Sequence, residues 1–224
     1  MKTDYELKDI HPEDISDLLV KVERSFKIKF EDKELMHLST FGELCDQITN
    51  KIQLYNSDDC TSQQAFYKLR DAISSTLQID KKTISTNFPL ADLLPRKSRH
   101  LATKIIEETL GFELNILRPP HWITITLTIL LFASLIGIFF HWQIGLFGLL
   151  LAIAGFWLAG KIGNELDLQT VGQVVEKMKR ENYLKSRRNP NTFNKNEIEQ
   201  ILIDWFSNEF DLDKSKLTRE ATFV

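Results

Sequence analysis

Charge is absent from one long stretch of the sequence. The 42 residues from Pro119 to Gly160 contain no Lys, Arg, Asp or Glu, although the whole chain is 26% charged and has a mean hydropathy of -0.19. A membrane-spanning helix needs about 20 apolar residues, so this stretch fits two spans better than one. We expect helices at about 122–140 and 144–160, joined by a turn near His141 and Gln143. A buried helical hairpin in a soluble protein is the alternative, but cores rarely contain charge-free stretches of this length.

Lys and Arg are also absent from the turn of this hairpin, whereas both of its flanks carry several. Basic residues concentrate on the cytoplasmic side of membrane proteins, so we expect both flanks and both termini to be cytoplasmic. Trp122, Trp142 and Trp157 lie near the ends of the spans, where indole rings are favoured. The opening residues, MKTDYELKDI, lack the apolar region of a signal peptide, so we expect none to be removed. The sequence thus predicts a two-span protein of the cytoplasmic (inner) membrane.

Residues for metal, redox or nucleotide chemistry are scarce. The chain has two cysteines, Cys45 and Cys60, and their wide spacing predicts neither a zinc site nor a disulfide framework. The five His residues are scattered and form no HExxH pattern, which argues against a metalloenzyme. The basic stretch KSRRNPN at 185–191 has no interleaved aromatic residue, so we do not expect nucleic-acid binding. We therefore expect no catalytic residue, no metal and no enzymatic activity.

Two stretches outside the hairpin resemble each other. The sequence STFGELCDQI at 39–48 parallels QTVGQVVEKM at 169–178, and each predicts a short amphipathic helix that a longer helix follows after a polar linker. Three pairs have the spacing of helix caps: Thr40 with Glu43, Thr170 with Gln173, and Asn194 with Glu197. A repeat of this kind predicts a duplicated all-α unit.

These stretches resemble the acyl carrier protein family, a small bundle with a long first helix, a long loop and two further helices. Residues 18–48, LLVKVERSFKIKFEDKELMHLSTFGELCDQI, resemble the second and third helices of the family. Residues 66–94 and 198–224 each resemble the first helix with its loop. The resemblance covers most of the chain outside the hairpin, in four pieces.

The order of these pieces predicts an all-α fold with two carrier-like bundles and a transmembrane hairpin. An outer bundle consists of residues 1–58, which carry a second and a third helix, and of 193–224, which carry the first. An inner bundle consists of 59–118 and 161–184, with the hairpin at 119–160 inserted and 185–192 as a linker. The outer bundle is then circularly permuted, because short helices alone bury too little apolar surface. In the competing arrangement the C-terminal part completes a neighbouring chain, which gives a domain-swapped homo-oligomer.

One position in each bundle bears on cofactor chemistry. The family attaches phosphopantetheine to a serine, within an Asp-Ser-Leu motif, at the start of the second helix. In the inner bundle Ser98 falls on this position, but Lys97 and Arg99 flank it, and a second register places Arg96 there. In the outer bundle the position holds Pro12, which suits the first residue of a helix. We therefore expect no cofactor; the alternative is phosphopantetheine on Ser98, and otherwise Ser98 caps a helix or faces solvent.

Basic residues gather beside the predicted spans. Residues 61–118 carry 9 Lys and Arg against 6 Asp and Glu, whereas residues 1–60 carry 8 against 14. Each base near an anionic leaflet contributes about 1 kcal/mol of attraction. We expect lipid headgroups or a protein partner to bind six basic residues, here called the basic collar: Arg96, Lys97, Arg99, Lys104, Arg118 and Lys161.

The sequence as a whole predicts a membrane-anchored, non-catalytic protein that docks partner proteins at the cytoplasmic face of a lipid bilayer. The resemblance implies a partner from lipid or acyl metabolism. Two alternatives stay open. One is a true membrane-tethered carrier with phosphopantetheine on Ser98, and the other is a sensor of anionic lipids that acts through the basic collar.

Overall fold

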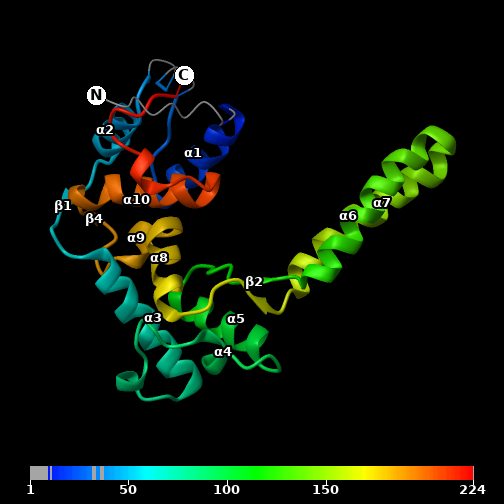
Figure 1. Ribbon diagram of the computed structural model, residues 1–224. Helices are drawn as coiled ribbons and strands as arrows, with labels where there is room; N and C mark the ends of the chain where they lie inside the picture. The colour runs from blue at the N-terminus through cyan, green and yellow to red at the C-terminus, as the bar shows by residue number, and fades with distance from the viewer. Residues whose placement is uncertain (1–9, 11, 32–33, 36–37, 224) are drawn as a thin grey trace. The chain divides into compact units, whose positions relative to one another are not determined.

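The computed structural model describes residues 10, 12–31, 34–35 and 38–223, which are mostly helical (Figure 1). The helices are α1 Pro12–Phe26, α2 Phe41–Lys51, α3 Thr61–Leu77, α4 Leu90–Leu93, α5 Arg99–Leu110, α6 His121–Phe140, α7 Trp142–Ile162, α8 Val171–Glu181, α9 Tyr183–Ser186 and α10 Lys195–Phe210. The strands are β1 Tyr55–Asn56, β2 Leu117–Arg118, β3 Glu165–Leu166 and β4 Thr192–Phe193, and two 3-10 turns occupy Lys81–Thr83 and Lys214–Lys216. The predicted helical class is confirmed, and each strand is only two residues long.

Two of the predicted helix caps form reciprocal hydrogen bonds. The Glu43 N–H donates to Thr40 Oγ1 (3.2 Å), and the Glu43 carboxylate accepts from the Thr40 N–H (3.2 Å). Thr170 and Gln173 repeat this arrangement at 3.3 Å in both directions. Each pair satisfies N–H groups that the first turn of a helix leaves without a partner. The predicted starts of α2 and α8 are therefore confirmed.

Contacts divide the chain into two compact units. The terminal unit comprises Met1–Asp71 and Val175–Val224, and the central unit comprises Ala72–Val174. The divisions fall inside α3 and α8, whereas the sequence predicted boundaries near residues 58 and 184. The subdivision into two carrier-like bundles stays a prediction.

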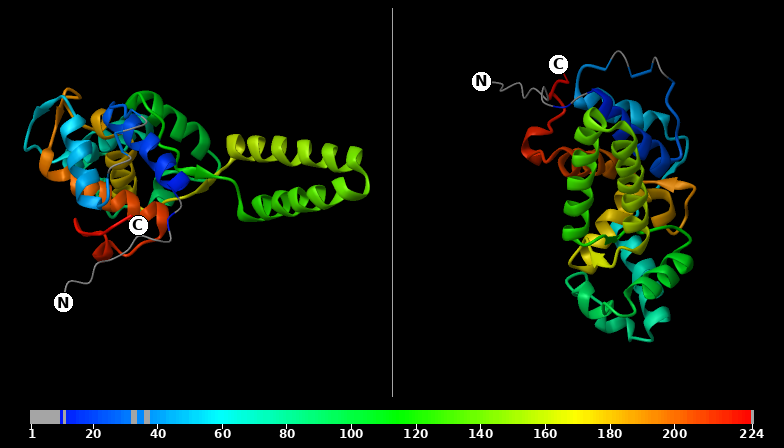
Figure 2. Two further views of the ribbon diagram at one scale, coloured as in Figure 1. Left: turned by 90° about the horizontal axis from the view of Figure 1, so that it is seen from above. Right: turned by 90° about the vertical axis from the view of Figure 1, so that its right-hand side faces the viewer.

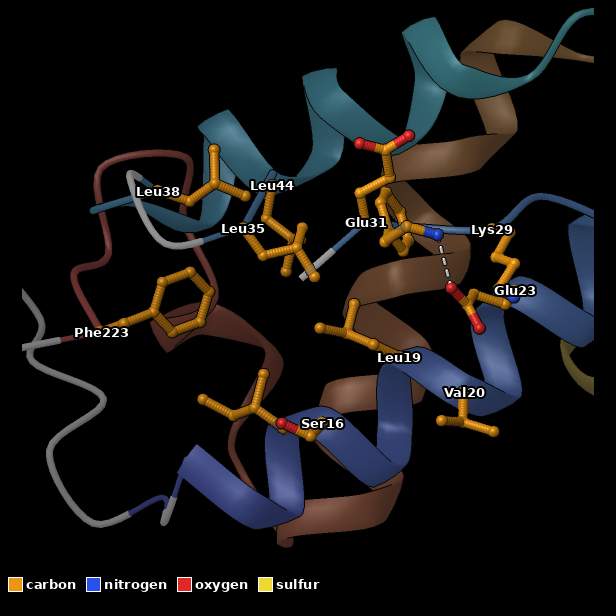
Figure 3. Close-up of a pocket in the computed structure, with 12 residues that line it drawn as sticks. Ser16, Leu19, Val20, Glu23, Lys29, Glu31, Leu35, Leu38, Leu44 and Phe223 are labelled. Atoms are coloured by element: carbon orange, nitrogen blue, oxygen red, sulfur yellow. Dashed lines mark hydrogen bonds between the residues drawn. The ribbon is translucent and has the colours of Figure 1, made fainter. Parts of the chain in front are cut away.

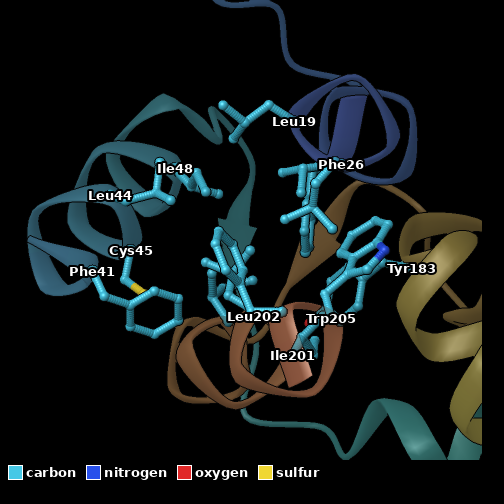
Figure 4. Packing of buried hydrophobic residues seen from close by; sticks show 14 of the residues in the cluster. Leu19, Phe26, Phe41, Leu44, Cys45, Ile48, Tyr183, Ile201, Leu202 and Trp205 are labelled. Carbon is cyan, nitrogen blue, oxygen red and sulfur yellow. The ribbon is translucent and has the colours of Figure 1, made fainter. Parts of the chain in front are cut away.

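One hydrophobic core in the terminal unit draws on α1, α2, α9 and α10 (Figure 4). The rings of Phe41 and Phe206 pack edge to face at 5.1 Å, and those of Phe26 and Tyr183 are 5.0 Å apart. Trp205 lies in the same cluster and is fully buried. Each large side chain removed from water contributes about 2 kcal/mol. Residues from both ends of the chain thus share one core.

Main-chain hydrogen bonds also join the two ends of the chain. The Phe41 N–H donates to the Ala221 carbonyl (2.8 Å), and the Phe223 N–H donates to the Ser39 carbonyl (3.1 Å). These bonds place Thr40 opposite Thr222 in an isolated antiparallel bridge. Elsewhere in the terminal unit, β1 pairs with β4 in parallel.

The helices α6 and α7 form a long antiparallel hairpin within the central unit (Figure 2). Gly or Ala recurs every third or fourth residue along α7, at 145, 148, 152, 155 and 159. A Cβ at Gly145 would lie 2.4 Å from the Ile138 backbone N, and one at Gly148 would lie 2.3 Å from Ser134 Oγ. Small residues let two helix backbones approach this closely.

Both hairpin helices are long and apolar enough to cross a membrane. In the most apolar 18 residues of each helix, only 6% of the residues of α6 and 17% of those of α7 are buried. The predicted spans at about 122–140 and 144–160 are therefore present as helices. The second span starts earlier than predicted, at Trp142, because His141 alone makes the turn with φ -144° and ψ 88°. It also ends later, at Ile162, so that Lys161 lies in its last turn.

Candidate functional site

The two chain segments at the base of the hairpin are fastened together. Strands β2 and β3 pair antiparallel, with Leu117 opposite Leu166 and Arg118 opposite Glu165. A guanidinium N–H of Arg118 donates to the Asp167 carboxylate at 3.1 Å. The chain therefore enters and leaves the hairpin at one place.

The start of α5 is tied to the segment that follows α7. The guanidinium of Arg99 donates to the carbonyls of Leu94 (2.9 Å) and Asn164 (2.7 Å). The Asn164 amide donates to the Arg96 carbonyl (2.8 Å), and Arg96 lies 3.6 Å from the Glu165 carboxylate. Burial lowers the pKa of Arg99, and the charge of Arg96 adds to this effect. Arg99 of the basic collar thus acts as a brace, since its guanidinium joins two backbone carbonyls that lie far apart in the sequence.

Lys104 and Lys161 of the basic collar line one pocket of 170 Å³, which lies between α5, the residues before β2 and the end of α7. His100 also lines this pocket, and its Nε2–H donates to the Lys161 carbonyl (3.1 Å). The Lys161 ammonium stands over the Trp157 ring, 3.9 Å from its centroid. Contact with an indole face stabilises a cation by about 1 kcal/mol. His100 was not among the predicted site residues, because no sequence pattern relates it to the end of the second span.

Lys97 and Ser98 are both exposed. Ser98 is the N-cap residue of α5, with φ -110° and ψ -3°, but its side chain makes no capping hydrogen bond. Its N–H donates to the Pro95 carbonyl (3.0 Å), and its carbonyl accepts from Ala102 (2.9 Å). The sequence predicted two roles for Ser98 without a cofactor, helix capping and exposure to solvent. The contacts agree with exposure, because the hydroxyl makes no capping hydrogen bond. An exposed hydroxyl at a helix start is also sterically open to modification.

A larger, apolar pocket of 660 Å³ lies in the terminal unit, between α1, α2, the segment that joins them and the C-terminal segment (Figure 3). Its walls include Leu19, Leu44 and Phe223, and the side chains of Glu23 and Lys29 stand beside them. The Glu23 carboxylate accepts from the Phe30 N–H (2.5 Å), which holds one wall in place. The pocket offers apolar surface to a ligand or to a partner side chain.

A buried arginine was missed at the sequence level. Arg187 lies in the stretch interpreted as a linker, yet its side chain is fully buried. Its guanidinium donates to Thr61 Oγ1 (2.5 Å) and lies 4.0 Å from the Glu197 carboxylate. It also donates to the carbonyls of Ser57 (3.3 Å) and Asp59 (3.2 Å), and its Nε–H donates to Thr192 Oγ1 (3.2 Å). Nothing in the local sequence distinguishes Arg187 from its exposed neighbour Arg188, because the partners of Arg187 at 57–61 lie far away along the chain.

Glu197 belongs to this network rather than to a helix cap. Asn194 caps α10 as predicted, by accepting from the Asn196 N–H (3.0 Å). Glu197, the second half of the predicted pair, instead accepts from the Thr61 N–H (2.9 Å) and from the Tyr183 hydroxyl (3.2 Å). The pKa of the Tyr183 hydroxyl is raised, mainly because the side chain is buried.

No group of three or more His, Cys, Asp or Glu side chains that could hold a metal ion occurs within the described residues. Both cysteines are free thiols; Cys45 is buried in the terminal core and Cys60 is exposed. Burial raises the pKa of Cys45 from 9.0 to about 12. The buried thiol is therefore a packing group rather than a nucleophile.

No family model matches the chain, and no curated protein or solved structure matches it. The resemblance to acyl carrier proteins therefore stays a prediction from the sequence.

Proposed function

We propose that the protein is a non-catalytic, carrier-like docking protein that a helical hairpin anchors at the cytoplasmic face of a membrane. The observation that carries this proposal is the surface of the hairpin. Large apolar side chains that are more than half exposed cover both helices, among them Ile129, Phe132, Phe147 and Leu150. Lipid tails stabilise such a surface, whereas water does not.

Hydroxyl groups within the hairpin support the same proposal. Thr126 donates to the Trp122 carbonyl (2.8 Å), Thr128 to the Thr124 carbonyl (2.8 Å), and Ser134 to the Leu130 carbonyl (2.6 Å). A polar group in hydrocarbon needs a partner within the protein, because the lipid tails offer none. These three hydroxyls of α6 satisfy this requirement within their own helix.

The cytoplasmic orientation rests on the Lys and Arg residues of both flanks and on their absence from the turn. The docking role rests on the resemblance and on the apolar pocket of the terminal unit, which has the surface that a partner side chain needs. A partner from lipid or acyl metabolism follows from the resemblance alone, since a fold does not fix a function.

The anchoring and its orientation are tested together in membrane vesicles. We expect the full chain to stay with the membrane through alkaline extraction. Cys60 is exposed and Cys45 is buried, so a membrane-impermeant maleimide reports on one site. We expect it to label Cys60 in inside-out vesicles and not in right-side-out vesicles. Release by alkali contradicts the anchor, and labelling from the outer side contradicts the orientation.

Docking is tested by a photo-crosslinking residue placed at Val20, which is half exposed and lines the apolar pocket. We expect adducts with one partner protein in cells. The same probe at Tyr55, which is 83% exposed and lies outside this pocket, is the matched control. Equal adducts at both positions, or none at Val20, contradict the proposed docking surface.

A second candidate function is a membrane-tethered carrier with phosphopantetheine on Ser98. The exposure of Ser98 at the start of α5 is the observation that favours it. Coexpression with a broad-specificity phosphopantetheinyl transferase, followed by intact-mass measurement, separates the two functions. An added phosphopantetheine that is lost in Ser98→Ala supports the carrier. An unmodified mass supports the non-catalytic proposal. The basic neighbours Lys97 and Arg99 favour this outcome, because the surface around the serine of working carriers is acidic.

A further inference from the structure

The pocket beside the hairpin base contains a buried hydroxyl without a partner. Thr103 on α5 is only 4% exposed, and its Oγ1 makes no hydrogen bond to any described residue. Thr103 is one of the residues that line the 170 Å³ pocket. A buried hydroxyl without a partner costs about 1–3 kcal/mol. A ligand oxygen that reached this hydroxyl would remove the cost.

The charges around the pocket favour an anion. Two basic residues, Lys104 and Lys161, belong to the lining. The single carboxylate of the lining, Glu107, already accepts from the backbone N–H groups of Leu114 (2.6 Å) and Asn115 (3.3 Å). These bonds engage one oxygen of the carboxylate, and the two basic residues outnumber the one acidic residue of the lining. The pocket volume of 170 Å³ exceeds several times the roughly 30 Å³ that one water occupies in the liquid, so a tetrahedral oxyanion fits.

The position of the pocket indicates the source of the anion. Gly160 and Lys161, in the last turns of α7, form part of its wall. The apolar surface of the hairpin ends at this level, where a bilayer presents its phosphates. Trp157, under the Lys161 ammonium, is the residue type that favours this interface.

We infer that the pocket formed by Thr103, Lys104 and Lys161 binds the phosphate of one anionic phospholipid. This inference rests on the proposed membrane anchor and gives that anchor a lipid preference. The phosphate accepts from the two ammonium groups and from the Thr103 hydroxyl, while the acyl chains lie along the hairpin. The shared chemistry is a phosphate oxyanion, so free phosphate is the rival source.

The test uses the full chain in uncharged detergent micelles, titrated with phosphatidylglycerol and followed by native mass spectrometry. We expect one retained lipid per chain. Lys104→Gln and Lys161→Gln each weaken this binding about tenfold, because each removes a charge-assisted hydrogen bond. Thr103→Val weakens it about threefold and leaves thermal stability unchanged or raised, since the hydroxyl has no partner among the described residues. Lys97→Gln is the matched control, because Lys97 is an exposed base of the same collar outside the pocket.

Three outcomes overturn the inference. The first is an equal loss in Lys97→Gln, which indicates general attraction to anionic surfaces. The second is full affinity in Thr103→Val. The third is displacement of the lipid by inorganic phosphate at matched concentrations, which assigns the pocket to a free anion. Alkaline extraction of the same variants separates this inference from the anchor: a chain that resists alkali but binds no lipid overturns the lipid site alone.

Discussion

Arg187 illustrates what a single buried charge does in the terminal unit. Its guanidinium donates to the carbonyls of Ser57 and Asp59 and to the Thr61 hydroxyl, and it forms an ion pair with the Glu197 carboxylate. A buried ion pair gains little over an apolar substitute, but the loss of one partner leaves the other uncompensated. The network therefore specifies how the segment before α3 meets the start of α10.

We predict that Arg187→Met lowers the free energy of unfolding by about 3 kcal/mol, because Glu197 loses its positively charged partner and the carbonyls of Ser57 and Asp59 lose a donor. Thermal unfolding in micelles, followed by circular dichroism, measures the change. Arg188→Met removes the same charge from an exposed neighbour, and we expect a change within about 0.5 kcal/mol. Similar losses in the two variants contradict a specific role for the buried network.

The two cysteines should differ in reactivity. At pH 8 we expect a maleimide to modify Cys60 rapidly and Cys45 only after unfolding, since Cys45 is 2% exposed and its pKa is raised to about 12. The folded thiol keeps its proton between pH 9 and 12, where the unfolded thiol loses it. Its contribution to stability is therefore complete below about pH 9 and decreases as the pH rises toward 12. Cys45→Val should remove this part of the alkaline loss in a pH series of thermal unfolding; an unchanged pH dependence contradicts it.

Sequence reasoning succeeded at residues whose environment is local. The spacing of Thr40 with Glu43 and of Thr170 with Gln173 predicted two helix caps, and both form. The patterns could not separate Arg187 from Arg188, or Arg99, which braces the backbone, from exposed Lys97. These distinctions depend on carbonyls far away along the chain, for which a sequence carries no local signal.

The hairpin helices α6 and α7 and the starts of α2 and α8 were predicted within a few residues, because helix caps and apolar periodicity are both local signals. The four-residue helices α4 and α9 and the two-residue strands were not predicted. Such short elements have almost no periodicity of their own, and tertiary packing stabilises them.

Close packing of α6 against α7 can be tested with one methyl group. We predict that Gly145→Ala destabilises the hairpin by about 1–3 kcal/mol, because the new Cβ meets the Ile138 backbone at 2.4 Å. Gly160→Ala on the same helix is the control, since a Cβ there meets nothing within 4 Å. Both changes raise helix propensity by about 1 kcal/mol, so the control should be neutral or stabilised. Thermal unfolding in micelles measures the difference, and equal effects contradict the packing.

At the scale of the whole molecule, the two ends of the chain complete one core. The order of the repeats predicted that the C-terminal helix complements the N-terminal pair, and the shared core places α10 against α2. Whether these parts are carrier-like bundles stays a prediction, because helical composition alone does not define that fold. The choice between pairing within one chain and exchange between chains also needs an experiment.

An engineered disulfide between the two ends of the chain distinguishes pairing within one chain from exchange between chains. Thr40 and Thr222 oppose each other in an antiparallel bridge, and Cα atoms about 4.5 Å apart at such a position accept a disulfide. In a variant without the native cysteines, we expect oxidation of Thr40→Cys with Thr222→Cys to give a cross-linked monomer on a denaturing gel. A covalent dimer at low protein concentration indicates the domain-swapped oligomer instead. The two single-cysteine variants show the background of cross-linking between chains.

The β2–β3 pair makes the membrane segment separable from the rest of the chain. Arg118 and Glu165 face each other across this pair, so a turn of two residues, Asn-Gly, can replace everything between them and close an ordinary β-hairpin. The excised chain should be water-soluble and retain its other helices, as measured by circular dichroism without detergent. The pocket beside Thr103 would lose the wall formed by α7, and its phosphate binding with it. The hairpin can thus be removed at one position of the fold, the β2–β3 pair, and a different membrane anchor can be inserted at the same position.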